Sequence, residues 1–263
     1  MNDVTCRGYA PALMAALLFT PAATSTLSAQ AAPAPLDSGS LFTKRDAVLT
    51  GLAVAATAAV FSVDSRIAHR FQAGNPNYAA GTTLRSAAEK FSFVNEKSLF
   101  GAGVLGYAIS RVATGPTSAS TDIAAHVSEA VLISTVFNTV IRGVGGRSRP
   151  FVTNGDNPHD FNLGKGFSNF DYRAFPSVHA SSSFATAAVL TAETRRRHPS
   201  AALAVGLVSY GVAAMPGLSR IYLGKHWASD VVMGAFVGTL TGLKVEWFEH
   251  SRQDSWVRRV FLH

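Results

Sequence analysis

Six long apolar stretches dominate this chain of 263 residues, and each has the composition of a helix. They cover residues 44–63, 97–114, 121–142, 178–196, 199–216 and 226–248, and a shorter helix is expected at 82–91. Alanine and glycine recur within them, which favours closely packed helices, and no alternating pattern of useful length predicts a strand. The sequence therefore predicts an all-α fold: a six-helix bundle with a long loop, 143–176, between the third and fourth core helices.

The first 31 residues have the features of a secretory signal peptide. Arg7 is followed by an apolar core from Tyr9 to Phe19 and then by small residues. We place the cleavage after Ala31, with a linker at 32–42 and one helical domain at 43–263. An uncleaved membrane anchor is the alternative, although the apolar run is short for one. Cys6, the single cysteine, falls in the segment to be removed, so no disulfide is expected.

The chain is basic, with a formal net charge of +7, although only 15% of its residues are charged. Basic proteins bind nucleic acid, anionic membranes or anionic substrates. No basic stretch with interleaved aromatic residues predicts nucleic-acid binding, so we expect no nucleic-acid partner. The charge fits a phosphorylated lipid or small-molecule substrate, or association with an acidic membrane. A merely solubilising surface is the alternative.

The segment from Ser219 to Asp230 places an arginine, a histidine and a carboxylate at a spacing that suits attack on phosphorus. If a helix begins near Lys225, His226 and Asp230 lie one turn apart on the same face. The carboxylate can then accept one imidazole proton and leave the other nitrogen free to attack. Arg220, expected in the loop before that helix, offers a planar set of donors for phosphoryl oxygens. Taken alone, the segment also fits a His–Asp capping pair with an incidental arginine.

Two further clusters lie upstream of this segment. Arg142 and Arg149 belong to a glycine-rich stretch that follows an apolar run. Ser177 follows a proline and is predicted to be a helix N-cap, where free backbone N–H groups favour a phosphate. His179, in the first turn of that helix, can donate a proton to a departing alkoxide.

The three clusters together predict phosphoryl transfer, with His226 as nucleophile, Asp230 orienting it and His179 as the acid. Phosphoryl transfer depends mainly on positioning and on charge stabilisation, so three arginines can replace metal ions. No cluster with metal-ligand spacing occurs elsewhere in the sequence, and we expect no metal requirement.

These motifs resemble those of the type 2 phosphatidic acid phosphatase and vanadium haloperoxidase superfamily: Lys-x6-Arg-Pro, Pro-Ser-Gly-His and Ser-Arg-x5-His-x3-Asp. The third matches at every fixed position, whereas Val178 replaces the glycine of the second and Arg142 the lysine of the first. The resemblance implies a helical bundle of that kind and a metal-independent phosphatase that forms a phosphohistidine. It also implies a phosphate-binding set of Arg142, Arg149, Ser177, Val178 and Arg220. Valine serves at position 178 if only its N–H is needed, which we favour.

The resemblance leaves the reaction and the substrate open. We favour hydrolysis of phosphomonoesters, with lipid phosphates or diphosphates as substrates. The alternatives are a vanadate-dependent haloperoxidase and a catalytically inert phosphate-binding protein. No cofactor is expected, although vanadate can bind as a phosphate mimic.

Localisation is open in the same way, because spanning a bilayer requires about 20 predominantly apolar residues and only some of the helices approach this. We favour a periplasmic protein after signal cleavage, soluble or membrane-associated. An integral inner-membrane protein with a periplasmic active site is the alternative. Arg195, Arg196 and Arg197 are expected at the end opposite the motifs, and the positive-inside rule would then put the motifs outside.

Several other side chains are given ordinary structural roles. We expect His126 to be a packed core residue and His250 to lie at the surface. Arg147 can add to the positive field around a bound anion, although a solvent-facing charge is the default expectation. Phe161, Phe167 and Phe170 in the long loop can contact a lipid tail, although such aromatics more often fix a loop to its domain.

Overall fold

The computed structural model describes residues 41–71 and 82–251, and within them the fold is all-α. The long helices are α2 (Lys44–Phe61), α5 (Glu96–Thr114), α6 (Ala119–Gly145), α8 (Val178–Arg197), α9 (Ala202–Tyr222) and α10 (Ala228–Ser251). The short ones are α3 (Asp64–Arg70), α4 (Thr83–Phe91) and α7 (Lys165–Ser168), with 3-10 turns at Pro150–Val152, Phe170–Tyr172 and Pro199–Ala201. The predicted signal peptide, 1–31, and most of the linker, 32–42, lie outside the described residues.

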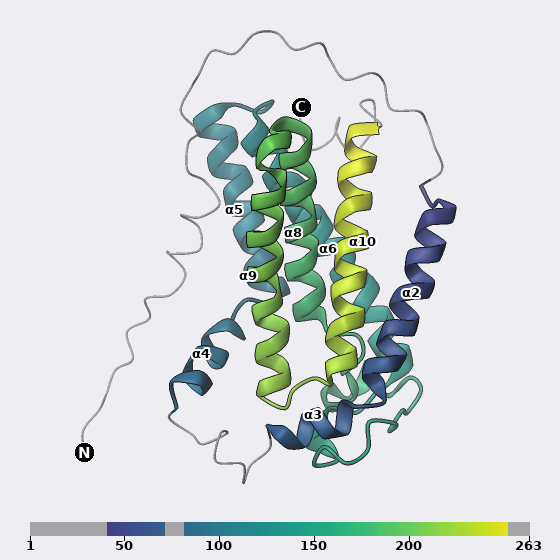
Figure 1. The fold of residues 1–263 in the computed structure, drawn as a ribbon. Helices are drawn as coiled ribbons and strands as arrows, with labels where there is room; N and C mark the ends of the chain where they lie inside the picture. The colour runs from purple at the N-terminus through teal and green to yellow at the C-terminus, as the bar shows by residue number, and fades with distance from the viewer. Residues whose placement is uncertain (1–40, 72–81, 252–263) are drawn as a thin grey trace, which may run out of the picture.

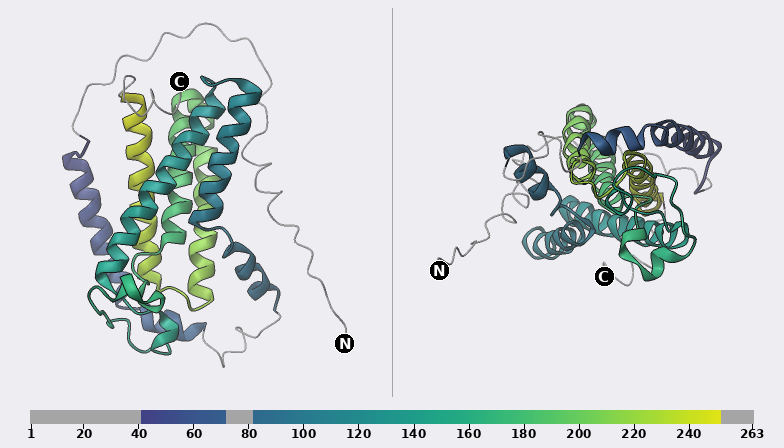
Figure 2. Two further views of the ribbon diagram at one scale, coloured as in Figure 1. Left: turned by 180° about the vertical axis from the view of Figure 1, so that it is seen from behind. Right: turned by 90° about the horizontal axis from the view of Figure 1, so that it is seen from below.

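Helix α8 lies at the centre of the bundle and packs against α6, α9 and α10 (Figure 1). Helix α5 pairs with α6 on one side, and α2 runs along the outside of α10 (Figure 2). Small and branched apolar side chains, such as Ala130, Val131, Ala185 and Val189, fill the space between α6 and α8 without exposure to solvent. Burial of these side chains positions the ends of the helices, where the predicted motifs lie.

Glycines on one face of α10 allow it to approach α8 closely. A Cβ atom added at Gly238 would lie 2.1 Å from the carbonyl oxygen of Ser181. One at Gly234 would lie 2.4 Å from the carbonyl oxygen of Ser177. Any side chain at these positions would therefore push the two helices apart, so the glycines set the distance between the motif on α8 and the motif on α10.

The six predicted core helices are all present, with boundaries that differ by a few residues. The largest difference is α9, which was expected to end at Pro216 and instead continues to Tyr222. A proline removes one helical hydrogen bond. At this turn the hydroxyl of Ser183 donates to the carbonyl of Ala213 over 2.9 Å, so packing against α8 carries the helix through the proline. Helix α3 was not predicted.

Four helix ends meet at one end of the bundle, at the bottom of Figure 1. They are the C-terminal ends of α6 and α9 and the N-terminal ends of α8 and α10, and the long loop between α6 and α8 lies beside them. The opposite end holds the start of α2 and the end of α10 (Figure 1). All three sequence motifs therefore lie at the same end.

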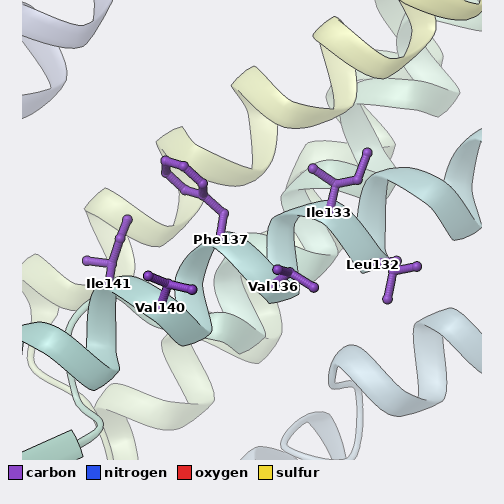
Figure 3. Close-up of a pocket in the computed structure, with 6 residues that line it drawn as sticks. All are labelled: Leu132, Ile133, Val136, Phe137, Val140 and Ile141. Atoms are coloured by element: carbon purple, nitrogen blue, oxygen red, sulfur yellow. The ribbon is translucent and has the colours of Figure 1, made fainter. Parts of the chain in front are cut away.

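Among residues 41–71 and 82–251, three helical segments are long and apolar enough to cross a membrane: Ala119–Gly145, Pro199–Tyr222 and Ala228–Ser251. The bent pair formed by α2 and α3 makes a fourth if it counts as one span. Large apolar side chains lie exposed on their outer faces, including Val136, Phe137 and Leu207. On α6 they line an open apolar groove of about 390 Å³ (Figure 3), formed by Leu132, Ile133, Val136, Phe137, Val140 and Ile141. Water solvates such an apolar surface poorly, and lipid solvates it well.

Candidate active site

The rings of His179 and His226 lie next to each other at the motif end, with 6.3 Å between their centroids and 58° between their planes. His179 is the second residue of α8, and His226 lies in the turn that precedes α10. Two backbone hydrogen bonds fix this arrangement. The N–H of His226 donates to the carbonyl of Arg220 over 3.2 Å, and that of Ser177 donates to the carbonyl of Asp230 over 2.9 Å. The second and third motifs are thereby joined through the main chain.

The three arginines predicted to bind phosphate come from three separate segments and lie close enough to act electrostatically on both histidines. Arg142 lies in the last turn of α6, and Arg149 precedes the 3-10 turn that begins at Pro150. Arg220 was expected in a loop but lies in the last turn of α9, because that helix continues through Pro216. The structure thus brings all three guanidinium groups to the two imidazoles.

Four buried nitrogen atoms of this group have no hydrogen-bond partner among the described residues: Nε of Arg142, Nε of Arg220, Nδ1 of His179 and Nδ1 of His226. Leaving a buried donor unpaired costs about 1–3 kcal/mol, so proteins rarely gather several in one place without use. A tetrahedral oxyanion can accept from several donors at once. The cluster therefore has the form of an oxyanion pocket.

Burial and the neighbouring arginines keep both imidazoles neutral in the empty pocket. Desolvation, followed by the charges of Arg220, His226 and Arg149, lowers the pKa of His179 to about 2. Desolvation and the charges of Arg149 and Arg220 also lower the pKa of His226 well below its ordinary value. A neutral His226 has a free lone pair. His179 can hold a proton only when a bound anion offsets the arginines.

The predicted contact between His226 and Asp230 is present but long, at 3.4 Å between Nδ1 and Oδ2. The helix begins at Ala228 rather than near Lys225, so His226 lies before it and only Asp230 is in its first turn. Asp230 has closer partners: the backbone N–H of Trp227 donates to its Oδ2 over 2.8 Å, and Arg147 contacts its Oδ1 over 2.6 Å. The carboxylate is thus fixed beside the imidazole rather than tightly bonded to it.

Arg147 was expected to face solvent and is instead completely buried, which corrects the sequence-based prediction. Its Nη1 donates to Asp230 and its Nη2 to Asp64 of α3 over 2.8 Å. Ser229 completes the network: its backbone N–H donates to Asp64 over 2.9 Å, and its hydroxyl contacts both Asp64 and Arg147. Because α3 itself was not predicted, the sequence offered no acidic partner for Arg147.

Two further polar residues near the pocket were missed. Nη1 of Arg220 donates to the hydroxyl of Ser92 over 2.8 Å, and Ser92 ends α4 as its C-cap. Glu96, the first residue of α5, attracts both Arg142 and Arg220 electrostatically. No motif marks either residue, and only the fold brings the α4–α5 connection to the arginines.

Ser177 caps α8 as predicted: its side chain accepts from the N–H of Ala180. Val178 is the first residue of that helix and is buried. Among the described non-glycine residues only Asn154 has a positive φ, so Val178 needs no backbone angle that a branched residue avoids. Valine therefore fits the loop as expected.

The aromatic residues of the long loop fix it to the bundle. The ring of Phe161 stacks on Phe61 with 6.3 Å between centroids, and the ring of Phe167 packs over Gly143 of α6. Phe170 lies 4.2 Å from the guanidinium of Arg149. Phe167 and Phe170 remain 57% and 60% exposed, so their outer edges stay at the surface.

The described residues form an all-α bundle with an arginine- and histidine-lined oxyanion pocket at one end. The exposed apolar faces of the bundle suit a protein that lies in or at a membrane. The sequence profile of the PAP2 superfamily matches residues 124–253, which include all three motifs. The chain belongs to the PAP2 superfamily.

Two known proteins are similar to this chain. The crystal structure of a transmembrane PAP2-type phosphatidylglycerolphosphate phosphatase from Bacillus subtilis has a TM-score of 0.52 and 18% sequence identity, and the match covers 81% of this chain and 98% of that one. At this identity the likeness shows the fold. A lipid A 1-phosphatase from Porphyromonas gingivalis is 42% identical over 69 residues, which are 26% of this chain and 15% of that protein.

Proposed function

We propose that this protein is a lipid phosphate phosphatase that works through a phosphohistidine on His226 and needs no metal ion at the reacting phosphate. The observation that carries the proposal is the set of four unpartnered buried nitrogens on Arg142, Arg220, His179 and His226. A phosphoryl group bound there would accept hydrogen bonds from the guanidinium nitrogens and lie between the two imidazoles, and its charge would oppose that of the surrounding arginines. The two rings, 6.3 Å apart, would then lie on opposite sides of the phosphorus.

The reaction has two displacements at phosphorus. In the first, Nε2 of His226 attacks, the bond from phosphorus to the ester oxygen breaks, and His179 gives its proton to the departing alkoxide. In the second, water attacks the phosphohistidine, the P–N bond breaks, and His179 takes the proton that the water loses. Inorganic phosphate leaves, and both imidazoles return to their starting states.

Binding of the substrate prepares the acid for the first step. His179 is neutral in the empty pocket because its pKa is lowered to about 2. A bound phosphate monoester is dianionic, and its charge opposes that of the arginines. Its arrival therefore raises the pKa of His179 and supplies the protonated imidazole where the alkoxide will form.

A lipid substrate accounts for features that a soluble ester does not require. The exposed apolar faces of α6 and α9 run the length of the bundle toward the pocket, and Phe167 and Phe170 lie exposed beside it. The names of both similar proteins refer to phosphorylated lipids. We infer that the acyl or prenyl tail stays in the bilayer while the headgroup enters the pocket.

We further propose an integral inner-membrane protein whose pocket faces the periplasm. Helix α2 begins at the end opposite the pocket (Figure 1). If α2 spans the bilayer, a cleaved signal peptide would place that end outside and the pocket inside. The basic residues Lys44, Arg45 and Arg195 to Arg197 lie at that same end, which favours a cytoplasmic location for it. An uncleaved N-terminus in the cytoplasm fits both features.

The test is phosphate release from a lipid panel by the purified protein in detergent, with phosphatidic acid, phosphatidylglycerol phosphate, a prenyl diphosphate and a lipid A phosphate as substrates. His226→Asn should remove activity and acid-labile labelling by a radioactive phosphate ester. His198→Asn, at an exposed position beyond the far end of α8, is the matched control and should retain both. Full activity in His226→Asn would refute the mechanism. Halide oxidation that depends on added vanadate would favour the haloperoxidase alternative.

A further inference from the structure

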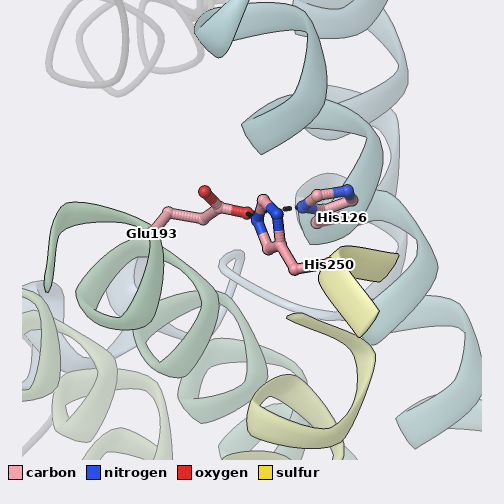
Figure 4. Close-up of side chains that lie close together, drawn as sticks. All are labelled: His126, Glu193 and His250. Atoms are coloured by element: carbon pink, nitrogen blue, oxygen red, sulfur yellow. Dashed lines mark hydrogen bonds and ion pairs between the residues drawn. The ribbon is translucent and has the colours of Figure 1, made fainter. Parts of the chain in front are cut away.

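A second cluster of titratable side chains lies at the end of the bundle opposite the pocket. His126 of α6, Glu193 of α8 and His250 of α10 point toward one another (Figure 4), and one ligand atom from each lies within 4.8 Å of the other two. Glu193 is 14 residues beyond His179 on α8, so the cluster lies about 21 Å along the helix from the pocket. The proposed phosphatase mechanism does not use it.

The carboxylate of Glu193 is the centre of this cluster. Its Oε1 lies 2.6 Å from Nδ1 of His126 and 2.9 Å from Nε2 of His250. Glu193 is completely buried and His126 is 5% exposed. His126 was expected to be a packed, hydrogen-bonded residue, and it is. His250 was expected at the surface, and its contact with Glu193 corrects that expectation.

Further carboxylates surround the cluster. Oε1 of Glu246 lies 3.8 Å from Nε2 of His250. Glu249 is 4% exposed, its Oε1 has no hydrogen-bond partner, and it repels Glu129 electrostatically. Burying several like charges together is unfavourable unless a cation offsets them.

The arginines of this region offset only part of the negative charge. Arg197 contacts Glu193 over 3.0 Å and Asp122 over 3.4 Å, and Arg196 contacts Glu246 over 2.8 Å. These two guanidinium groups thus contact three carboxylates, those of Asp122, Glu193 and Glu246, and Glu129 and Glu249 add two more carboxyl groups that neither of these contacts includes. A divalent cation would reduce this excess.

We propose that His126, Glu193 and His250 bind a divalent metal ion, with Zn²⁺ as the preferred ion, and that the ion ties α6, α8 and α10 together. Two imidazoles and one carboxylate are a ligand set that suits Zn²⁺, with water or Glu246 as the fourth ligand. A tetrahedral ion about 2.0–2.1 Å from each ligand keeps neighbouring ligand atoms roughly 3.3 Å apart. The present contacts of 2.6 and 2.9 Å need only a small expansion.

The competing explanation is a metal-free network in which each histidine donates a proton to Glu193. The same contacts serve both arrangements, because a metal ion would replace the protons that the ring nitrogens share with the carboxylate. Metal content separates them, and it does not depend on phosphatase activity. Failure of this proposal would therefore leave the proposed phosphatase function untouched, and the reverse also holds.

The experiment uses the full-length protein in detergent, treated with a chelator, exchanged into chelator-free buffer and mixed with ZnCl₂. After gel filtration we expect about one Zn²⁺ per chain by mass spectrometry and a melting temperature several degrees higher than without zinc. The variants His126→Gln and His250→Gln should each bind zinc at least tenfold more weakly. His198→Gln and Glu89→Gln, exposed residues outside the cluster, are matched controls and should bind as the wild type does.

Co²⁺ provides a measurement on the wild type alone, in case a variant does not fold. The ion should give visible absorption bands of tetrahedral coordination that added ZnCl₂ abolishes. Either of two results would overturn the proposal: no zinc retained and no such bands in the wild type, or equal zinc binding in the wild type and in both histidine variants.

Discussion

Arg147 holds Asp230 by a contact of 2.6 Å between Nη1 and Oδ1, and both side chains are completely buried. Nη2 of the same guanidinium lies 2.8 Å from Oδ2 of Asp64 in α3. One guanidinium therefore connects α3, which follows α2, with α10, which carries the carboxylate next to the proposed nucleophile. Within the described residues the Arg147 side chain bonds to Pro158, Ser229, Asp230 and Asp64 and to neither histidine nor a pocket arginine, so it acts on the site through Asp230.

Replacing Arg147 by lysine should destabilise the protein and slow it. A single ammonium group cannot bridge both carboxylates, and breaking a buried ion pair costs about 3–5 kcal/mol. We expect a lower melting temperature and a lower kcat with a smaller change in KM. The control is Arg85→Lys, because Arg85 and Glu89 form an ion pair on α4 that is partly exposed and contributes roughly 0.3–0.5 kcal/mol. Equal effects of the two substitutions would contradict the role given to Arg147.

Replacing His179 by asparagine should affect substrates unequally. If His179 protonates the leaving group, an alkyl phosphate should lose about 10²- to 10⁴-fold in rate, whereas 4-nitrophenyl phosphate should lose much less because its phenolate leaves without a proton. His226→Asn should abolish both reactions. Steady-state rates on the two substrates provide the comparison, and a uniform loss in His179→Asn would remove the acid role.

Acid should destabilise the empty enzyme through His179. Its pKa is about 2 in the folded protein and about 6.5 when unfolded, so below pH 6.5 the unfolded chain binds the extra proton. Above pH 6.5 His179 does not reduce the free energy of unfolding. As the pH falls below this value the free energy of unfolding declines, and at pH 5 the loss due to His179 is about 2 kcal/mol. Melting temperatures between pH 7.5 and 5 should fall less in His179→Asn than in the wild type. Parallel curves would count against the neutral, buried state of His179.

Gly238→Ala should separate α8 from α10 and disturb the pocket. The new methyl group would lie 2.1 Å from the carbonyl oxygen of Ser181, and backbone atoms cannot move aside as a flexible side chain can. Overpacking of this kind costs about 1–3 kcal/mol or more. Gly101→Ala on α5, where nothing lies within 4 Å of the new methyl group, is the control and should be neutral or slightly stabilising. Thermal unfolding and phosphatase activity measure both effects.

The sidedness of the pocket can be tested with single cysteines in a Cys6→Ser background. Ser168→Cys lies in the long loop at the pocket end, and Ser200→Cys lies between α8 and α9 at the opposite end; both positions are exposed. A membrane-impermeant thiol reagent applied from the periplasmic side should label Ser168→Cys and not Ser200→Cys. The reverse pattern would place the pocket in the cytoplasm.

Much of the fold could be predicted because each long helix is a continuous apolar stretch in the sequence. The prediction of helix boundaries was wrong where tertiary contacts decide them, because packing against α8 allows α9 to continue past Pro216. Within the pocket, the two histidines and the three arginines could be predicted because they occur at the fixed spacings of known motifs. Arg147, Ser92 and Glu96 were not, because their roles depend on partners far away in the chain.

The histidine and carboxylate cluster at the other end shows the same limit. His126 and His250 lie 67 and 57 residues from Glu193, so no spacing rule connects them. Only the packing of α6, α8 and α10 side by side, with α6 antiparallel to the other two, brings them together.

The position of Asp64 has a practical consequence for anyone who shortens this chain. A fragment trimmed to the matched residues 124–253 would contain all three motifs. It would lack Asp64, which bonds to Arg147, and Ser92, which bonds to Arg220. The matched residues alone therefore lack two contacts that hold Asp230 and Arg220 in place. Expression of active protein should require the segment that begins with α2.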